Sequence, residues 1–193
     1  YSSVADNALL DPGDTFTLEA WINPAASAAG DYYIFDKGTN GYALAKVSGG
    51  LFFNKSGVST IFQTAFDILT AGLWHHVVVT KAGVTTKLFL NGADITPAIT
   101  DATIAATATN LFIGSTATPG NYFNGSLDEV AIYPTALSAA RVAAHYNAGL
   151  LGQYLVEWKP YMQLPRGIAS FVEPDKGRAS IDSTTFSVLD SGG

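Results

Sequence analysis

The stretch from Trp74 to Ile95 constrains the fold of this chain more than any other part of the sequence. It contains the run Val77–Thr80, whose β-branched side chains favour a strand that is buried on both faces. A second run, Thr85–Leu90, ends at Asn91-Gly92, a strong hairpin signal because a type I′ turn needs positive φ at both central residues. The stretch therefore predicts an antiparallel meander of three strands, at about residues 74–81, 85–90 and 93–96.

Short strand-like runs separated by glycine and other turn residues fill most of the remaining chain up to Leu150. In Thr15–Asn23 the even-numbered apolar residues face one side of the strand, and Glu19 and Trp21 face the other. Further strands are predicted at residues 32–36, 42–47, 51–55, 60–66, near 103, 110–114 and 125–133, with an edge strand within 1–10. Many short strands with little helical periodicity indicate a β-sandwich or a barrel.

One segment, Ser138–Ala148, has helical periodicity instead. Its apolar stripe predicts a helix that lies flat on the sandwich, and it consists of Ala139, Val142, Ala143 and Tyr146. Ser138 is predicted to be the N-cap of this helix and Gly149 its C-terminal stop.

The composition changes after Leu150, where charged residues become denser and three prolines occur. Strands are predicted at Gln153–Lys159 and Ile168–Val172, which would give this part a small β structure of its own. The sequence therefore predicts a sandwich domain at residues 1–150, and at 151–193 a C-terminal extension or the start of a further domain.

Composition and charge exclude several classes of protein. Hydrophobic residues make up 48% of the 193 residues and charged residues 13%, which argues for a packed globular body and against disorder. The net charge of −6 and the lack of a basic cluster argue against nucleic acid or an anionic membrane as a partner. Without cysteine the fold has no disulfides, and no apolar run is long enough to cross a bilayer.

Several motifs resemble those of laminin-G-like domains, which have the concanavalin A-like lectin/glucanase fold. These motifs are WHHVV at 74–78, LFLNG at 88–92, FTLEAWI at 16–22, LFIGS at 111–115, FNGSLDEVAIY at 123–133 and ALS at 136–138. The resemblance implies an all-β antiparallel jelly-roll sandwich with one short C-terminal helix and a small β-type extension. It also implies that the first strand of the family is truncated here, because that strand usually ends at a position matching Tyr1.

Catalysis is not expected, although glucanases share this fold. Retaining glycosidases need two carboxyl groups about 5–5.5 Å apart, and on a strand this requires residues of one face. The E-x-D-x-E pattern of the glucanase relatives is absent, and the adjacent Asp128 and Glu129 should point to opposite faces. The chain is therefore predicted not to be an enzyme.

Two kinds of metal site can be weighed from the sequence. His75 and His76 are neighbours on a predicted strand and project to opposite faces, so a structural role is favoured over zinc binding, with one buried and the other partly exposed. Calcium needs six to eight oxygen ligands, and candidates near strand ends are Asp6, Asn7, Asp14 and Asp128. Many laminin-G-like relatives bind one calcium ion, and the resemblance points to Asp128. The alternative is that these side chains cap ordinary turns.

A glycan is the favoured ligand class. Sugar sites stack a ring on an exposed aromatic side chain and fix it with amide or backbone groups. Tyr122, with Asn121 and Asn124 in a glycine-flanked loop, fits this description. Packing in the core or at its rim is the competing interpretation for any one aromatic residue, and Trp21 and Trp74 are assigned to the core.

These observations predict a non-catalytic recognition or attachment module in a larger surface, secreted or phage-virion protein. Its expected partners are a glycan or another ligand on a host surface, at an extracellular, cell-surface or virion-surface location. One alternative is an architectural module that binds no sugar and packs against neighbouring structural subunits. Another is an accessory domain of a carbohydrate-active enzyme whose catalytic part lies elsewhere.

Overall fold

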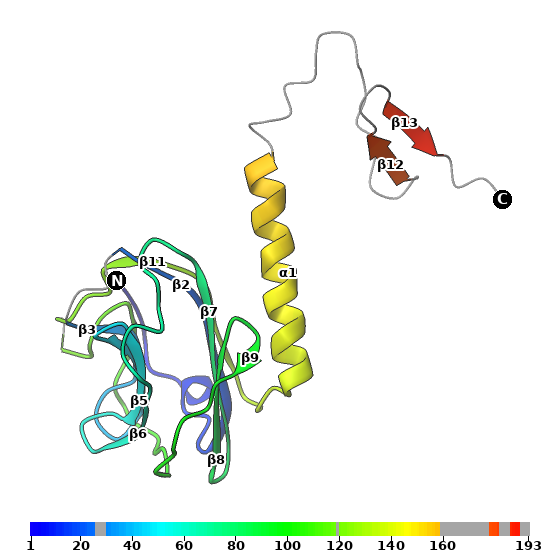
Figure 1. Cartoon of the computed structure of the whole chain (residues 1–193). Coiled ribbons are helices and arrows are strands. Elements are labelled where there is room, and N and C mark those ends of the chain that lie inside the picture. The colour runs from blue at the N-terminus through cyan, green and yellow to red at the C-terminus, as the bar shows by residue number, and fades with distance from the viewer. Residues whose placement is uncertain (26–29, 119, 159–177, 182–185, 190–193) are drawn as a thin grey trace. The chain divides into compact units, whose positions relative to one another are not determined.

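The computed structural model describes residues 1–25, 30–118, 120–158, 178–181 and 186–189 (Figure 1). The chain divides into two compact units, Tyr1–Leu151 and Gly152–Gly193, which are described separately. The first unit is an antiparallel jelly-roll β-sandwich of two sheets, as the sequence predicted.

The first sheet has six strands in the order β1-β10-β3-β4-β5-β6, and every neighbouring pair is antiparallel. The strands are β1 Ser2–Val4, β10 Leu111–Ile113, β3 Asp31–Asp36, β4 Tyr42–Val47, β5 Gly50–Lys55 and β6 Ser59–Gln63. The second sheet has five strands in the order β11-β2-β7-β8-β9, also antiparallel. Its strands are β11 Gly125–Tyr133, β2 Thr15–Pro24, β7 His75–Ala82, β8 Thr85–Leu90 and β9 Ala93–Asp94.

The predicted meander is confirmed as β7-β8-β9 in the second sheet. Asn91 and Gly92 join β8 to β9 with φ of 51° and 77°, so both carry the positive φ that the hairpin signal required. Every residue from Val77 to Thr80 is buried, because the core covers one face of β7 and a helix covers the other.

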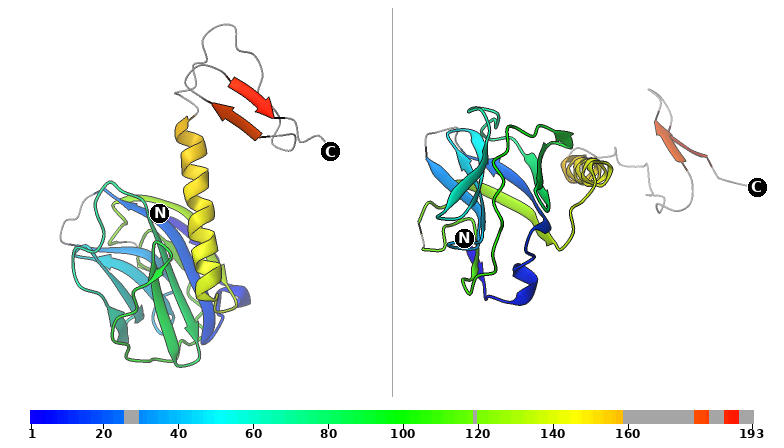
Figure 2. Two further views of the ribbon diagram at one scale, coloured as in Figure 1. Left: turned by 45° about the vertical axis from the view of Figure 1, so that its right-hand side comes forward. Right: turned by 90° about the horizontal axis from the view of Figure 1, so that it is seen from below.

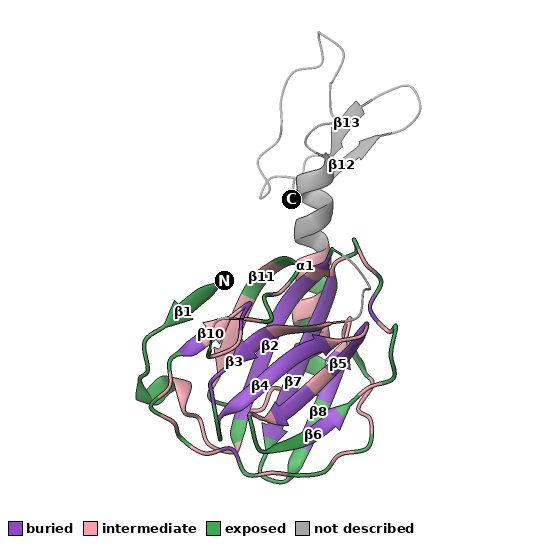
Figure 3. Ribbon diagram, turned by 90° about the vertical axis from the view of Figure 1, so that its left-hand side faces the viewer, coloured by how far each residue is buried: buried purple, intermediate pink, exposed green. Residues whose placement is uncertain are grey.

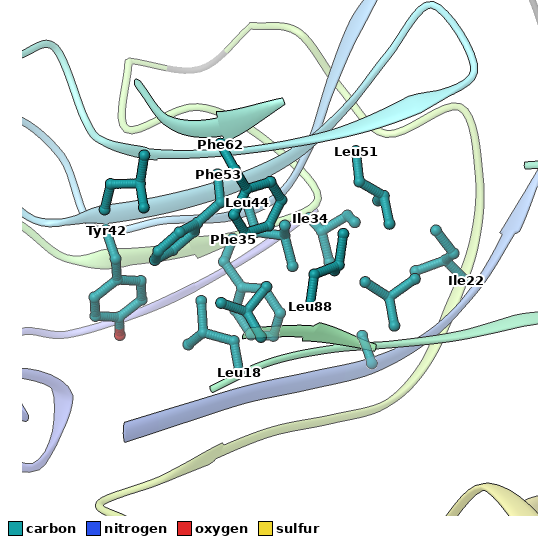
Figure 4. Close-up of a cluster of buried hydrophobic side chains, with 14 of the residues drawn as sticks. Leu18, Ile22, Ile34, Phe35, Tyr42, Leu44, Leu51, Phe53, Phe62 and Leu88 are labelled. Atoms are coloured by element: carbon teal, nitrogen blue, oxygen red, sulfur yellow. The ribbon is translucent and has the colours of Figure 1, made fainter. Parts of the chain in front are cut away.

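The main core lies between the two sheets (Figures 3 and 4). Alternation along β2 sends Phe16, Leu18, Ala20 and Ile22 into it. From the opposite sheet come Phe35, Tyr42, Leu44, Leu51, Phe53 and Phe62. Because the β2 residues of odd number point away from this core, they form the outer face of the five-stranded sheet.

The first part of helix α1 Ala139–Trp158, up to Gly149, lies against that outer face (Figure 2). Val142 forms a second small core with Val78 and Phe89. The Ser138 N-cap is confirmed, since its hydroxyl accepts a hydrogen bond from the Arg141 backbone N–H at 3.3 Å. Among the described residues, no helix is both long enough and apolar enough to span a membrane.

The prediction that Gly149 ends the helix is wrong, and so is the strand predicted from Gln153, because α1 continues through both positions to Trp158. Gly149 instead allows a close approach: a Cβ atom there would lie 2.4 Å from Cζ2 of Trp21. The glycine thus reflects packing against the sheet and not the left-handed conformation of a helix C-cap.

Several strand boundaries also differ from those predicted. No strand forms near Thr103, where the backbone N–H groups bond to acidic side chains, as Ile104 does to Asp14 at 2.8 Å. In residues 1–10 the edge strand β1 is followed by a 3-10 turn, η1 Ala8–Leu10. Strand β6 ends at Gln63, since the Thr64 hydroxyl already bonds to the Leu51 N–H at 2.9 Å.

The second unit contains a hairpin that the sequence analysis did not predict. Strand β12 Arg178–Ile181 pairs antiparallel with β13 Phe186–Leu189. The strand predicted at Ile168–Val172 lies outside the described residues.

Candidate functional site

Four loops meet at the end of the sandwich where β2 ends, and together they form its rim. The rim comprises the described residues of 23–25, 47–50, 64–74, 114–118 and 120–125. Backbone hydrogen bonds join one loop to the next: Gly72 N to Pro24 O at 2.7 Å, Ala25 N to Asn124 O at 2.9 Å, and Leu69 N to Gly49 O at 3.0 Å. The rim is therefore one connected surface.

The rim carries two strongly exposed aromatic side chains, Phe66, which is 59% exposed, and Tyr122. The Tyr122 side chain is 51% exposed and lies against Tyr1, which is 69% exposed, with ring centroids 5.4 Å apart and planes tilted by 31°. Tyr1 extends from the start of β1, whose partner β10 leads into the loop that carries Tyr122. The fold therefore places two exposed aromatic rings side by side.

The two predicted amide residues flank Tyr122 on the same turn, and both are exposed. Asn121 has a φ of 44° and accepts a backbone hydrogen bond from Tyr33 at 3.2 Å. Phe123 packs against the main core, so that Tyr122 and Asn124 on either side of it face solvent. Neither amide side chain forms a hydrogen bond with any residue that the structure describes. Asn121, Tyr122 and Asn124 thus share one anchored turn, with donors and acceptors free for a ligand.

The core interpretation holds for most other aromatic residues. Phe53, Phe62 and Tyr42 are buried between the sheets, and Trp21 is buried beneath α1. Trp74 is only half-buried.

Two of the predicted calcium ligands lie near the first turn of the chain. Asp6 pairs with the buried ammonium of Lys37 at 2.6 Å, a group that also donates to the carbonyls of Thr107 and Thr109. Asn7 caps η1, and its side chain accepts a hydrogen bond from Leu9 N at 3.0 Å. The Asp6 carboxylate is thus already bound to the Lys37 ammonium, and the Asn7 side-chain oxygen to the backbone of η1.

The other two calcium candidates lie on different elements. Asp14 accepts from Ile104 N at 2.8 Å, and its carboxylate is 3.6 Å from the buried ammonium of Lys81. Asp128 is exposed on β11 and accepts from Glu129 N at 2.8 Å. Within the described ranges, no three His, Asp or Glu side chains are grouped so that they could hold a metal ion. Calcium binding remains a prediction.

The histidines have structural roles. His75 and His76 are both buried, so the prediction that one of them is partly exposed is wrong. His75 Nε2 lies 3.0 Å from the backbone of Thr70. His76 Nε2 lies 2.7 Å from Glu19 Oε1 on β2, and His145 of α1 reaches the same carboxylate at 3.0 Å. One buried carboxylate therefore joins the sheet to the helix.

The environment of Glu19 shifts two pKa values. Burial raises the pKa of Glu19, but hydrogen bonds from His76, His145 and Tyr133 outweigh it and hold the pKa below its ordinary value of 4.5. The pKa of Tyr133 is raised to about 12, mainly by burial and to a smaller extent by the hydrogen bond to Glu19. The cluster is closed by α1, and none of the described residues places a second carboxylate opposite Glu19, so its geometry suits helix docking better than catalysis.

Tyr1 and the Glu19 cluster were missed by sequence reasoning. Tyr1 and Tyr122 are far apart in sequence, as are Glu19 and His145, and no local pattern links either pair. The alternation in β2, which turned Glu19 away from the core, was the one available signal for the second pair.

Residues 1–143, well over half of the chain, match the family model described as the Concanavalin A-like lectin/glucanases superfamily. Among curated proteins, none matches the chain.

Similar solved structures include domain 4 of AbnA, an extracellular GH43 arabinanase from Geobacillus stearothermophilus, in complex with arabinotriose. It is 17% identical with a TM-score of 0.57, over 74% of this chain and 70% of that one. The receptor-binding domain of botulinum neurotoxin type G is 13% identical with a TM-score of 0.54, and the match covers 70% of this chain and 38% of that one. A Trypanosoma rangeli sialidase is 14% identical with a TM-score of 0.50, and the match covers 68% of this chain and 22% of that one. The chain spans less than half of the latter two, and at these identities the likeness concerns the fold.

Proposed function

Because this chain belongs to the concanavalin A-like lectin/glucanases superfamily, we propose that it is a non-catalytic carbohydrate-binding module. The observation that carries this proposal is the exposed pair Tyr1 and Tyr122, flanked by the amides of Asn121 and Asn124. A similar structure supports the proposal, because the arabinanase domain is described in complex with arabinotriose.

The proposed binding mode follows from the chemistry of the rim. A sugar ring has an apolar face of C–H groups, which stacks on tyrosine, and an edge of hydroxyls, which bonds to amides. The turn that carries Tyr122 is anchored by Phe123 in the core and by backbone bonds to Tyr33 and Ala25. An anchored turn loses little conformational entropy on binding, which favours affinity.

A glycan array followed by calorimetry tests the proposal, with arabinotriose among the first probes. We expect Tyr122→Ala to weaken binding of the best glycan by about tenfold, since a stacked ring contributes on the order of 0.5–1.5 kcal/mol and about 1.4 kcal/mol corresponds to a factor of ten. Val84→Ala is the matched control, because Val84 is 75% exposed in the β7–β8 turn at the other end of β2. Equal binding by Tyr122→Ala and the wild type would place the ligand elsewhere.

The proposal also predicts that the chain does not cleave glycans. Asp128 and Glu129 lie at an irregularity in β11 where Glu129 has a φ of 47°, and the Glu19 carboxylate is occupied by histidines. Steady release of reducing ends from a polysaccharide, abolished by substitution of one acidic residue, would contradict this prediction.

The setting of the module is part of the proposal. We place it in a larger extracellular or surface-attached protein, either as an attachment module or as an accessory domain of a carbohydrate-active enzyme. The competing architectural function requires neighbouring structural subunits, for which a virion surface is one setting. Binding to a glycan that depends on Tyr122 would favour recognition over architecture.

A further inference from the structure

The four loops of the rim contain almost no charge. Segments 23–30, 47–50 and 114–125 contain no Asp, Glu, Lys, Arg or His, and segment 64–74 contains only Asp67. For comparison, the opposite end of the sandwich holds the ion pairs of Lys37 with Asp6 and of Lys81 with Asp101, each at 2.6 Å. The charged side chains of this unit are thus concentrated away from the proposed sugar site.

The lysine and histidine side chains nearest to the rim are not available to a ligand. Lys46 on β4 is buried, with its Nζ 4.9 Å from the centroid of the Tyr32 ring. Burial lowers the pKa of this lysine, and the charge of the nearby Asp67 carboxylate raises it, so this ammonium already has an anion as its neighbour. His75 is buried and bonded to Thr70. In the described chain, no lysine or arginine therefore presents an exposed charge at the rim.

The remaining charges near the rim are negative. Asp67 belongs to the rim itself, the Asp36 carboxylate accepts a hydrogen bond from the Ala117 backbone N–H at 2.7 Å, and the whole chain carries a net charge of −6. A sugar carboxylate or sulfate that enters such a site loses hydration without gaining the charge of a lysine or arginine side chain, which disfavours its binding. Neutral hydroxyls have no such requirement and can use the free amides of Asn121 and Asn124.

We propose that the rim selects neutral glycans and discriminates against glycans that carry carboxylate or sulfate groups. This inference rests on the proposed function and adds the chemical class of its ligand. Stacking on Tyr122 and hydrogen bonds to neutral amides bind through contacts that salt screens little. The affinity for a neutral ligand should therefore change little with salt concentration.

The experiment compares matched pairs of glycans on the full chain. Suitable pairs are galacto- and galacturono-oligosaccharides of equal length, and lactose with 3′-sialyllactose, each measured at low and high salt. We expect the acidic member of a pair to bind at least about tenfold more weakly, with a smaller difference at high salt. Equal or tighter binding of the acidic member, still lost in Tyr122→Ala, would overturn the selectivity and leave the proposed function intact. No binding of any glycan would overturn both.

A charge variant tests the cause of the selectivity. Thr118 is exposed in the rim, so Thr118→Lys adds a cation beside the site. We expect this variant to gain about tenfold in affinity for acidic glycans at low salt and to bind neutral glycans as before. Val84→Lys adds the same charge at the opposite end and should change neither affinity. If both lysine variants gain equally, the net charge of the chain and not the rim controls selectivity, and the inference fails.

Discussion

Trp21 and Gly149 show how one residue decides where α1 lies. A Cβ atom on Gly149 would stand 2.4 Å from the Trp21 ring, and Trp21 also stacks against Tyr146 with ring centroids 5.8 Å apart. The same ring is 5.1 Å from His76 on the neighbouring strand. Any side chain at position 149 must therefore push the helix away from the sheet.

Gly149→Ala should destabilise the protein, although the same change inside an exposed helix usually stabilises it by about 0.5–1 kcal/mol. The clash with Trp21 reverses the sign, and we expect a loss of about 1–3 kcal/mol, measured by urea denaturation. Asn147→Ala, at an exposed position of the same helix, is the control and should be neutral or slightly stabilising. A Gly149→Ala protein that is more stable than the wild type would show that the helix does not approach this ring.

At the scale of elements, local patterns predicted most of the strands, but not the docking of the helix. The meander followed from β-branched runs and the Asn91-Gly92 turn, whose requirements are met within a few residues. A glycine at position 149 is compatible either with the end of a helix or with a close approach between helix and sheet. Only its short distance to Trp21 in the structure shows that the second interpretation is correct. Likewise, Asn121, Tyr122 and Asn124 could be recognised as one loop, while the second ring, from Tyr1, is supplied by strand pairing.

Glu19 makes the docking of α1 dependent on pH. Its pKa is lower when folded than the ordinary 4.5, so its carboxylate stabilises the protein fully above pH 4.5. This contribution is lost as the pH falls through the folded-state value. Glu19→Gln should cost about 2 kcal/mol at neutral pH, because an amide cannot accept charge-assisted bonds from both His76 and His145.

The measurement is urea denaturation of both proteins at neutral pH and at acidic pH below 4.5. The two stabilities should converge in acid, where the wild-type carboxylate is protonated. Glu129→Gln, which alters an exposed acid on β11, should match the wild type throughout. A difference between wild type and Glu19→Gln that stays constant with pH would mean that the charge of Glu19 does not hold the helix.

At the scale of the whole sandwich, two buried lysines hold the segments that lack strands. Lys37 binds Asp6 and two carbonyls of the 95–110 segment, and Lys81 binds Asp101 and approaches Asp14. Each ammonium satisfies several oxygens at once, as a bound cation does. Removing one of these acids should leave a buried ammonium with one counter-charge fewer and destabilise the fold.

Calcium binding can be tested against this arrangement. If Asp128 belongs to a calcium site, millimolar calcium should raise the melting temperature of chelator-treated protein, since a ligand at a hundredfold excess over its Kd contributes about 2.7 kcal/mol. Asp128→Asn should remove most of that rise, because Asp128 is the exposed candidate whose carboxylate pairs with no described lysine. Asp14→Asn should instead lower the melting temperature with and without calcium, because Lys81 loses a neighbouring charge. A wild-type protein whose melting temperature does not respond to calcium would contradict a calcium site at Asp128. A response that survives Asp128→Asn would place the ion at other oxygens.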